Sequence, residues 1–150
     1  MEPPHAPYVT KENLIADLRS LGLVPSTTLL LHASVKSIGW IIGGPDIVIE
    51  ALLATLGDEG TLMMYAGWEE RPEHAFRWTE EHRAAFNTSC PPFDTERSRA
   101  NRKWSILTEY LRTWPGSCRS ANPGASMVAV GSKAAWLTAD HPIQYGKLKD

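Results

Sequence analysis

The sequence predicts an α/β fold, and two short apolar runs with a helical pattern between them are the main reasons. The runs cover residues 28–31 and 61–65, and each is continuous, as is typical of a buried strand. Between them, apolar residues recur at helical spacing: Ile49, Leu52, Leu53 and Leu56. Pro45 suits the first turn of that helix. Strand, loop, helix and strand within about forty residues is typical of a crossover unit.

A helix over residues 10–21 precedes this unit. Thr10 can cap it, leucines follow at helical spacing, and Gly22 ends the pattern. The segment 32–44, between the first strand and the next helix, contains three glycines and little periodicity in its first half, so we expect a loop there.

The C-terminal part contains three further predicted elements. A helix is expected over 101–113, a strand over 127–130, and the start of a short helix over 133–138. Trp104 and Trp136 fall on these helical patterns, so we expect both in the core.

The segment 67–100, called the excursion below, has a different character. It is rich in charged residues, contains three prolines, and has one short helical pattern near residues 79–86. Long excursions from compact domains are often functional. Its acidic residues could line a pocket for a cation, but arginines are interleaved with them, so a solvated charged face is the simpler interpretation. We expect residues 1–150 to form a single domain that carries this excursion.

The composition excludes several classes of protein. Hydrophobic residues make up 43% and charged residues 21% of the 150 residues, which is ordinary for a soluble globular chain. A net charge of -2 predicts no nucleic-acid partner. No apolar run approaches the roughly 20 residues of a membrane span, and residues 1–8 lack the apolar core of a signal peptide. The two cysteines form no CxxC pair, which favours a reducing compartment and a cytoplasmic protein.

Common catalytic motifs are missing from the sequence. The five histidines are scattered without an HExxH pattern, so we expect no metal site. There is no GxSxG elbow and no P-loop. The sequence therefore identifies no catalytic residue.

Three places could bind a ligand. The segment 32–37 directly follows a predicted strand, and its hydroxyls, lysine and free N–H groups could hold a phosphate or an amide chain, although many such segments are only loops. Arg119 beside Ser120 could bind a phosphate through two hydrogen bonds or form a surface salt bridge. Trp68 follows a strand end and could stack on a sugar ring.

Several blocks resemble, in order along the chain, those of the aminoglycoside 3-N-acetyltransferases. The matching blocks span residues 29–39, 43–45, 60–68, 91–94, 119–126 with 128–131, and 141–146. Each block is moderately specific, and together they make a strong resemblance. The resemblance implies a layered α/β/α fold with a mixed central sheet, incomplete relative to the family.

The same resemblance implies a function and a set of site residues. The implied reaction transfers acetyl from acetyl-CoA to the 3-amino group of a deoxystreptamine aminoglycoside, without a metal, and confers antibiotic resistance. The residues that would bind acetyl-CoA are His32, Ala33, Ser34, Val35, Lys36, Ser37, Arg119, Ser120 and Ser126. The residues that would face the aminoglycoside are Tyr65, Trp68 and Asp94.

The sequence departs from the family pattern in two respects. Asn122 stands where the family commonly has histidine, and asparagine cannot titrate. The family chain is also nearly twice as long, and its usual general base has no match here; His32 and His141 are local alternatives. A second hypothesis is therefore a truncated, inactive relative that binds CoA or a partner chain. Surfaces left uncovered by truncation would favour self-association.

Overall fold

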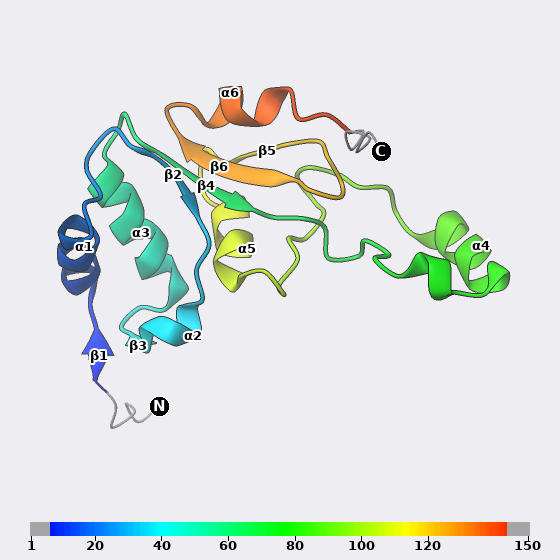
Figure 1. Ribbon diagram of the computed structural model, residues 1–150, viewed down its shortest axis with the longest axis horizontal. Helices are drawn as coiled ribbons and strands as arrows, with labels where there is room; N and C mark the ends of the chain where they lie inside the picture. Colours follow the sequence, from blue (N-terminus) through cyan, green and yellow to red (C-terminus); the bar gives the residue numbers. More distant parts are fainter. Residues whose placement is uncertain (1–6, 144–150) are drawn as a thin grey trace, which may run out of the picture.

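The computed structural model describes residues 7–143, and its centre is a four-stranded sheet (Figure 1). The strands are ordered β2-β4-β6-β5. Their bounds are β2 Thr28–Leu31, β4 Thr61–Tyr65, β6 Met127–Gly131 and β5 Cys118–Arg119. β2 runs parallel to β4, whereas β4–β6 and β6–β5 are antiparallel pairs. The predicted α/β fold with a mixed central sheet is confirmed.

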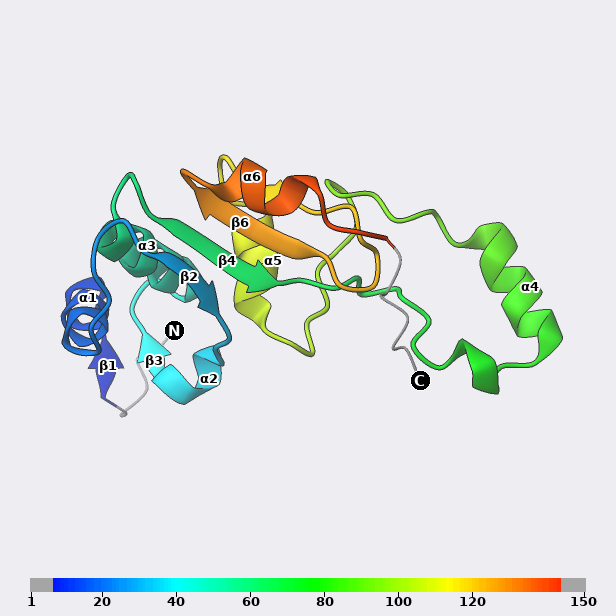
Figure 2. The same ribbon diagram turned by 45° about the horizontal axis from the view of Figure 1, so that its top comes forward.

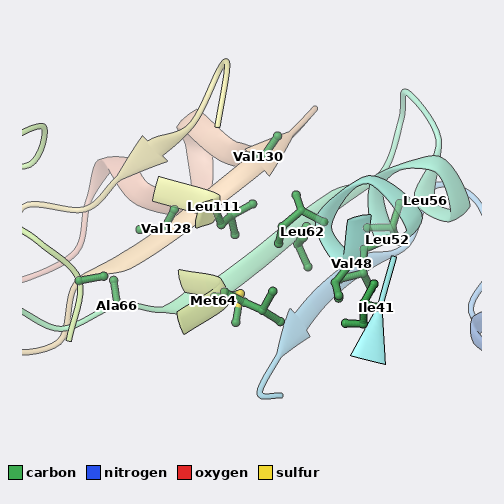
Figure 3. Close-up of a cluster of buried hydrophobic side chains, with 13 residues drawn as sticks. Ile41, Val48, Leu52, Leu56, Leu62, Met64, Ala66, Leu111, Val128 and Val130 are labelled. Atoms are coloured by element: carbon green, nitrogen blue, oxygen red, sulfur yellow. The ribbon is translucent and has the colours of Figure 1, made fainter. Parts of the chain in front are cut away.

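Helices cover both faces of this sheet and make three layers. They are α1 Lys11–Ser20, α3 Pro45–Leu56, α5 Ile106–Arg112 and α6 Ala134–Ala139. α3 and α5 pack on one face, α6 packs on the other over β6 and β5, and α1 packs on the outside of α3. Side chains alternate between the two faces along a strand, so Leu62, Met64 and Val128 share the face that α3 and α5 cover. They form the core together with Leu52 (Figure 3).

Three short elements complete the body: β1 Tyr8–Val9, α2 Val35–Ile38 and β3 Trp40–Ile41. A 3-10 helix, Ala75–Arg77, lies in the excursion. β1 and β3 form a small parallel sheet of their own. α2 and β3 lie in the segment 32–44, so the expectation of a plain loop there is wrong.

The helix ends follow local capping chemistry. Thr10 caps α1 in a capping box with Asn13, as predicted, and Pro45 lies at the start of α3. The predicted helix over 101–113 is correct only from Ile106 onward. Ser105 caps it there, because its Oγ accepts a hydrogen bond from the N–H of Leu107 at 3.2 Å.

β2 is not the buried strand that its apolar run predicts. It is an edge strand of the sheet as far as residues 7–143 show, and Leu30 on its outer face is 52% exposed. Leu29 and Leu31 pack against the core on the inner face. α6 contacts β4, β5 and β6, which leaves the outer face of β2 uncovered. Self-association through uncovered surfaces stays a prediction.

Both tryptophans expected in the core are exposed, so that prediction is wrong. Trp104 is 57% exposed because it lies just before α5 begins, and its ring contacts the edge of Tyr65 at 5.3 Å between centroids. Trp136 is 76% exposed because Ala134 and Thr138 are the buried side of α6. Helical spacing identified a stripe of the helix but not which side of it faces the sheet.

The excursion leaves the sheet after β4 and returns before α5. Its one α-helix, α4 (Glu80–Ser89), lies far from the sheet in two views (Figures 1 and 2). α4 has no buried residue, and the ring of its Phe86 contacts that of Trp78 edge to face, with centroids 5.3 Å apart. The helical pattern predicted near residues 79–86 is confirmed.

Candidate functional site

Polar segments meet at one end of the strands of the main sheet. β2 and β4 are parallel, so the segments after them, at 32–37 and 66–68, leave from the same end. β6 is antiparallel to β4, so the loop that precedes β6 also lies at this end. Ligands of open α/β sheets usually bind outside the carboxyl ends of strands. This end of the sheet therefore contains most of the predicted site residues.

The segment 32–37 divides into an inner and an outer side. Ala33 and Val35 are partly buried and pack against the core. The carbonyl oxygen of Ala33 also accepts a hydrogen bond from Oγ of Ser105 at 2.7 Å, which fixes the segment to the cap of α5. The polar residues of the segment are exposed: His32, Ser34, Lys36 and Ser37. Their side chains are available to a ligand.

The predicted cofactor residues fall into two groups rather than one. The segment 32–37 follows the edge strand β2, whereas Arg119 lies on the opposite edge strand β5. Two strands separate them, so three strand spacings of about 4.8 Å place the groups about 14 Å apart. A ligand that contacts both groups has to cross the ends of β4 and β6.

Arg119 donates its hydrogen bonds to the protein itself. Its Nε donates to Oγ of Ser126 at 3.1 Å, Nη1 donates to the carbonyl oxygen of Ser98, and Nη2 donates to that of Gly67. Its guanidinium also lies over the ring of Phe93, with Cζ 4.8 Å from the centroid. Burial, together with repulsion from Arg112, lowers the pKa of Arg119 to about 10, so it stays charged at neutral pH.

Ser126 and Ser120 are fully buried. Oγ of Ser126 donates to the carbonyl oxygen of Gly67 at 2.9 Å. Oγ of Ser120 accepts from the N–H of Met127 at 2.9 Å and lies 2.8 Å from Nδ1 of His141. Both hydroxyls therefore act inside the protein in this conformation, and their predicted contact with the cofactor stays a prediction.

Asn122 organises the loop between β5 and β6. Its Oδ1 accepts from the N–H groups of Gly124 and Ala125, both at 2.9 Å, and its Nδ2 donates to the carbonyl oxygen of Pro142 at 2.6 Å. The hydroxyl of Tyr65 donates to the carbonyl oxygen of Gly124 at 2.9 Å. Asn122 is nearly fully buried, which is consistent with a role in holding this loop.

A cavity of about 480 Å³ lies where the two ends of the excursion meet. Its lining residues are Trp68, Glu70, Cys90, Pro91, Pro92, Asp94, Arg97, Ser98 and Arg99. Cavities of this size commonly hold small ligands. The cavity joins two of the predicted substrate residues, Trp68 and Asp94, and it offers two carboxylates and two guanidinium groups.

Asp94 is ionised at neutral pH. Its Oδ1 accepts hydrogen bonds from the N–H groups of Arg97, at 2.7 Å, and of Glu96, at 2.9 Å. These backbone hydrogen bonds, with that of Arg97 the stronger influence, hold the pKa of Asp94 below its usual value of 3.8. The ring of Trp68 contacts that of Phe93 edge to face, with centroids 5.8 Å apart.

Sequence reasoning missed Phe93, Ser98 and Gly67 as parts of this site. Phe93 belongs to the block 91–94 that carries the family resemblance, which was a usable signal. No local signal pointed to the carbonyl oxygens of Ser98 and Gly67, because their partner Arg119 is distant in the sequence. Within residues 7–143, no group of three or more His, Cys, Asp or Glu side chains could hold a metal ion.

Comparison with known proteins identifies the family. Residues 30–149 match the family model described as aminoglycoside 3-N-acetyltransferase. The chain is 47% identical over 137 residues to aminoglycoside N(3)-acetyltransferase III of Pseudomonas aeruginosa, a match that covers 91% of this chain and 51% of the relative. It is 39% identical to aminoglycoside N(3)-acetyltransferase VII of Streptomyces paromomycinus, covering 89% and 47%.

Solved structures agree with this match. AAC-IIIb in a binary complex with CoASH superposes with a TM-score of 0.83 at 46% identity, over 93% of this chain and 52% of that one. AAC-VIa bound to sisomicin superposes with a TM-score of 0.84 at 32% identity, over 91% and 51%. The chain belongs to the aminoglycoside 3-N-acetyltransferase family, and it spans about half the length of the curated relatives that it matches. None of its described helices has the length and hydropathy needed to cross a bilayer.

Proposed function

We propose that this chain binds acetyl-CoA and a deoxystreptamine aminoglycoside and takes part in the transfer of acetyl to the 3-amino group of the antibiotic. The observation that carries the proposal is the match to aminoglycoside N(3)-acetyltransferase III of Pseudomonas aeruginosa at 47% identity across 91% of the chain. The CoASH complex of AAC-IIIb supports the choice of donor, and the sisomicin complex of AAC-VIa supports the choice of acceptor.

The reaction requires three events at one place. The 3-ammonium group has to lose a proton before its nitrogen can attack the thioester carbonyl. A C–N bond then forms, the C–S bond breaks, and the thiolate of CoA takes up a proton. The carbonyl oxygen carries negative charge during the attack and needs hydrogen-bond donors directed at it.

The exposed side of the segment 32–37 is our proposed contact for the cofactor. Lys36 can attract a phosphate of CoA, and the hydroxyls of Ser34 and Ser37 can donate to it. Ala33 and Val35 hold the segment against the core, so the polar residues start from a fixed backbone. Fixing the site before the ligand binds lowers the entropy lost on binding.

The cavity beside Trp68 is our proposed contact for the antibiotic. Glu70 and Asp94 can attract ammonium groups of the aminoglycoside, and the indole of Trp68 can stack on one of its rings. Acetylation removes one positive charge from the drug, which weakens an RNA affinity that depends on phosphate contacts.

A second candidate is binding without transfer. The histidines of the described site residues favour this candidate, because neither is placed as a general base. Nδ1 of His141 is hydrogen-bonded to Ser120, and no described residue forms a hydrogen bond that would orient the ring of His32. In this case the chain would bind CoA, or a partner chain that supplies the base.

The test combines a transfer assay with a binding assay. The chain is incubated with acetyl-CoA and sisomicin, and mass spectrometry follows the addition of one acetyl group to the drug. We expect acetylation by the wild-type chain and about tenfold weaker CoA binding by Lys36→Met, because one phosphate contact is lost. Lys133→Met, an exposed lysine next to α6, is the matched control. CoA binding without acetylation would favour the second candidate, and binding of neither ligand would contradict both.

A further inference from the structure

Arg119 joins the two ends of the excursion to the sheet. Gly67, which accepts from Nη2, directly precedes the outgoing wall of the cavity at Trp68. Ser98, which accepts from Nη1, is itself part of the returning wall. The third donor, Nε, donates to Oγ of Ser126, the residue just before β6, and this hydroxyl in turn donates to the carbonyl oxygen of Gly67. One guanidinium thus links both walls to the strand beneath them.

The aromatic contacts extend this link into the cavity wall. The guanidinium of Arg119 stacks on the ring of Phe93, and Phe93 contacts Trp68 of the opposite wall edge to face. Phe93 stands between Pro92 and Asp94, which both line the cavity. A shift of the guanidinium would therefore move Asp94 and Trp68 relative to each other.

The charge of Arg119 has no direct ion-pair partner within 4 Å among the described residues. The carboxylates that raise its pKa, Glu109, Asp94 and Glu70, act only through space and are outweighed by burial. A partly buried cation without a counter-ion is expensive. Two explanations for this cation compete. Either the hydrogen bonds of Arg119 are needed to hold the walls of the cavity, or an anionic ligand such as a CoA phosphate supplies the missing counter-ion.

We propose that Arg119 is a positioning residue that holds the two walls of the Trp68–Asp94 cavity at the separation required by the aminoglycoside, and that it does not bind the cofactor. The proposal rests on the proposed function for the identity of the ligand. The geometry favours this role because three guanidinium nitrogens each donate to the protein, and because the fork fits two backbone carbonyls that lysine cannot reach together.

Other contacts keep the excursion attached when Arg119 is changed. The N–H of Glu69 donates to the carbonyl oxygen of Arg99 at 3.1 Å, and the N–H of Arg102 donates to Oε2 of Glu69 at 2.8 Å. Arg119→Lys should therefore loosen the cavity without unfolding the chain. Thermal unfolding of each variant checks this.

Cys90 lines the cavity and reports on its walls directly. In a Cys118→Ser background, the rate at which a thiol reagent modifies Cys90 measures how often the walls separate. We compare Arg119→Lys with Arg83→Lys, a matched control on the exposed helix α4. Titration calorimetry with sisomicin and with CoA is run on Arg119→Lys, Arg83→Lys and the protein without either substitution.

We expect Arg119→Lys to speed Cys90 modification and to weaken sisomicin binding, each by about tenfold, while CoA affinity stays within about twofold and Arg83→Lys changes nothing. Phe93→Leu should change the same two quantities less, and it serves as the second variant if Arg119→Lys fails to fold. Weaker CoA binding with an unchanged Cys90 rate would overturn the proposal in favour of a phosphate contact. If the wild-type chain binds no sisomicin, the proposed function fails, and the Cys90 rates alone decide whether Arg119 holds the walls.

Discussion

The sheet body and the excursion are held together by different forces. In the body, Leu62, Leu107 and Val128 are completely buried in an apolar cluster that joins α3 and α5 to the sheet. In the excursion, α4 buries no residue, and order depends on polar contacts where the segment leaves and rejoins the body. The difference indicates that one chain can stabilise a core by burial and a peripheral segment by a few hydrogen bonds at its ends.

Glu109 is the acidic counterpart of Arg119 at the returning end. Its Oε2 accepts from the N–H of Ala100 and from Nε of Arg112, both at 2.8 Å. Arg112 also donates to the carbonyl oxygen of Glu96 in the excursion. α5, a body helix, thus holds the excursion through two charged side chains.

The largest expected effect is on the free energy of unfolding, and it compares a buried side chain of the body with a half-exposed one of the excursion. Leu62→Ala should lower the free energy of unfolding by about 2–5 kcal/mol, because it leaves a cavity in the core. Phe86→Ala, which removes one ring of the half-exposed pair in the excursion, should cost less than about 1 kcal/mol. Urea unfolding measures both. Equal losses would contradict the comparison.

A smaller effect is expected from glycines with positive φ. Gly131 ends β6 at φ 126°, and a Cβ there would lie 2.2 Å from the carbonyl oxygen of Gly60. Gly67, at the outgoing end of the excursion, has φ 58°, and its Cβ would meet no atom closer than 3.6 Å. Gly131→Ala should therefore cost about 3 kcal/mol and Gly67→Ala about 1 kcal/mol in thermal unfolding. A larger loss of stability for Gly67→Ala than for Gly131→Ala would contradict this comparison and show that the backbone is more closely packed at Gly67.

The smallest effect is the dependence of the unfolding free energy on pH that Glu109 causes. Burial raises the pKa of Glu109, but hydrogen bonds from Arg112 and from the N–H of Ala100 outweigh it and hold the pKa below the usual 4.5. The unfolded chain then binds the proton more readily, so the stabilisation is complete above pH 4.5 and is lost as pH falls through the lower folded value.

Glu109→Gln should remove this part of the acid dependence and cost about 1 kcal/mol at pH 7, since an amide cannot replace both charged contacts. Glu59→Gln, in an exposed turn, is the control and should retain the wild-type profile. Unfolding free energies from pH 7 to pH 3 check both variants. A wild-type profile for Glu109→Gln would mean that the carboxylate does not hold the returning end.

The elements that could be predicted are those with local causes. The cap at Thr10, the proline that begins α3 and the apolar face of that helix all act within a few residues. The wrong predictions concern burial, which depends on what packs against an element. Leu30 is exposed because nothing covers the outer face of β2 in the described residues, and Trp136 is exposed because it lies on the outer side of α6. β1, β3 and β5 have two residues each, too few for a periodic pattern.

The candidate site divides in the same way. The block from Tyr65 to Trp68 and the loop after β2 could be found because polar residues directly follow apolar runs. The contacts of Arg119 could not be predicted, because only the fold brings Gly67 and Ser98 to its guanidinium. The separation of the predicted cofactor residues into two groups also needed the strand order, which no sequence spacing contains.

The position of the excursion has a consequence for folding and for variation in length. It lies between β4 and β6, so pairing these strands closes a long loop, whereas β2, α3 and β4 can assemble from nearby segments. The entropy of closing such a loop grows only with the logarithm of its length, by about 0.6 kcal/mol for each doubling. The excursion, attached at its two ends, can thus gain or lose residues around α4 at little thermodynamic cost, while the strands beneath it keep their register.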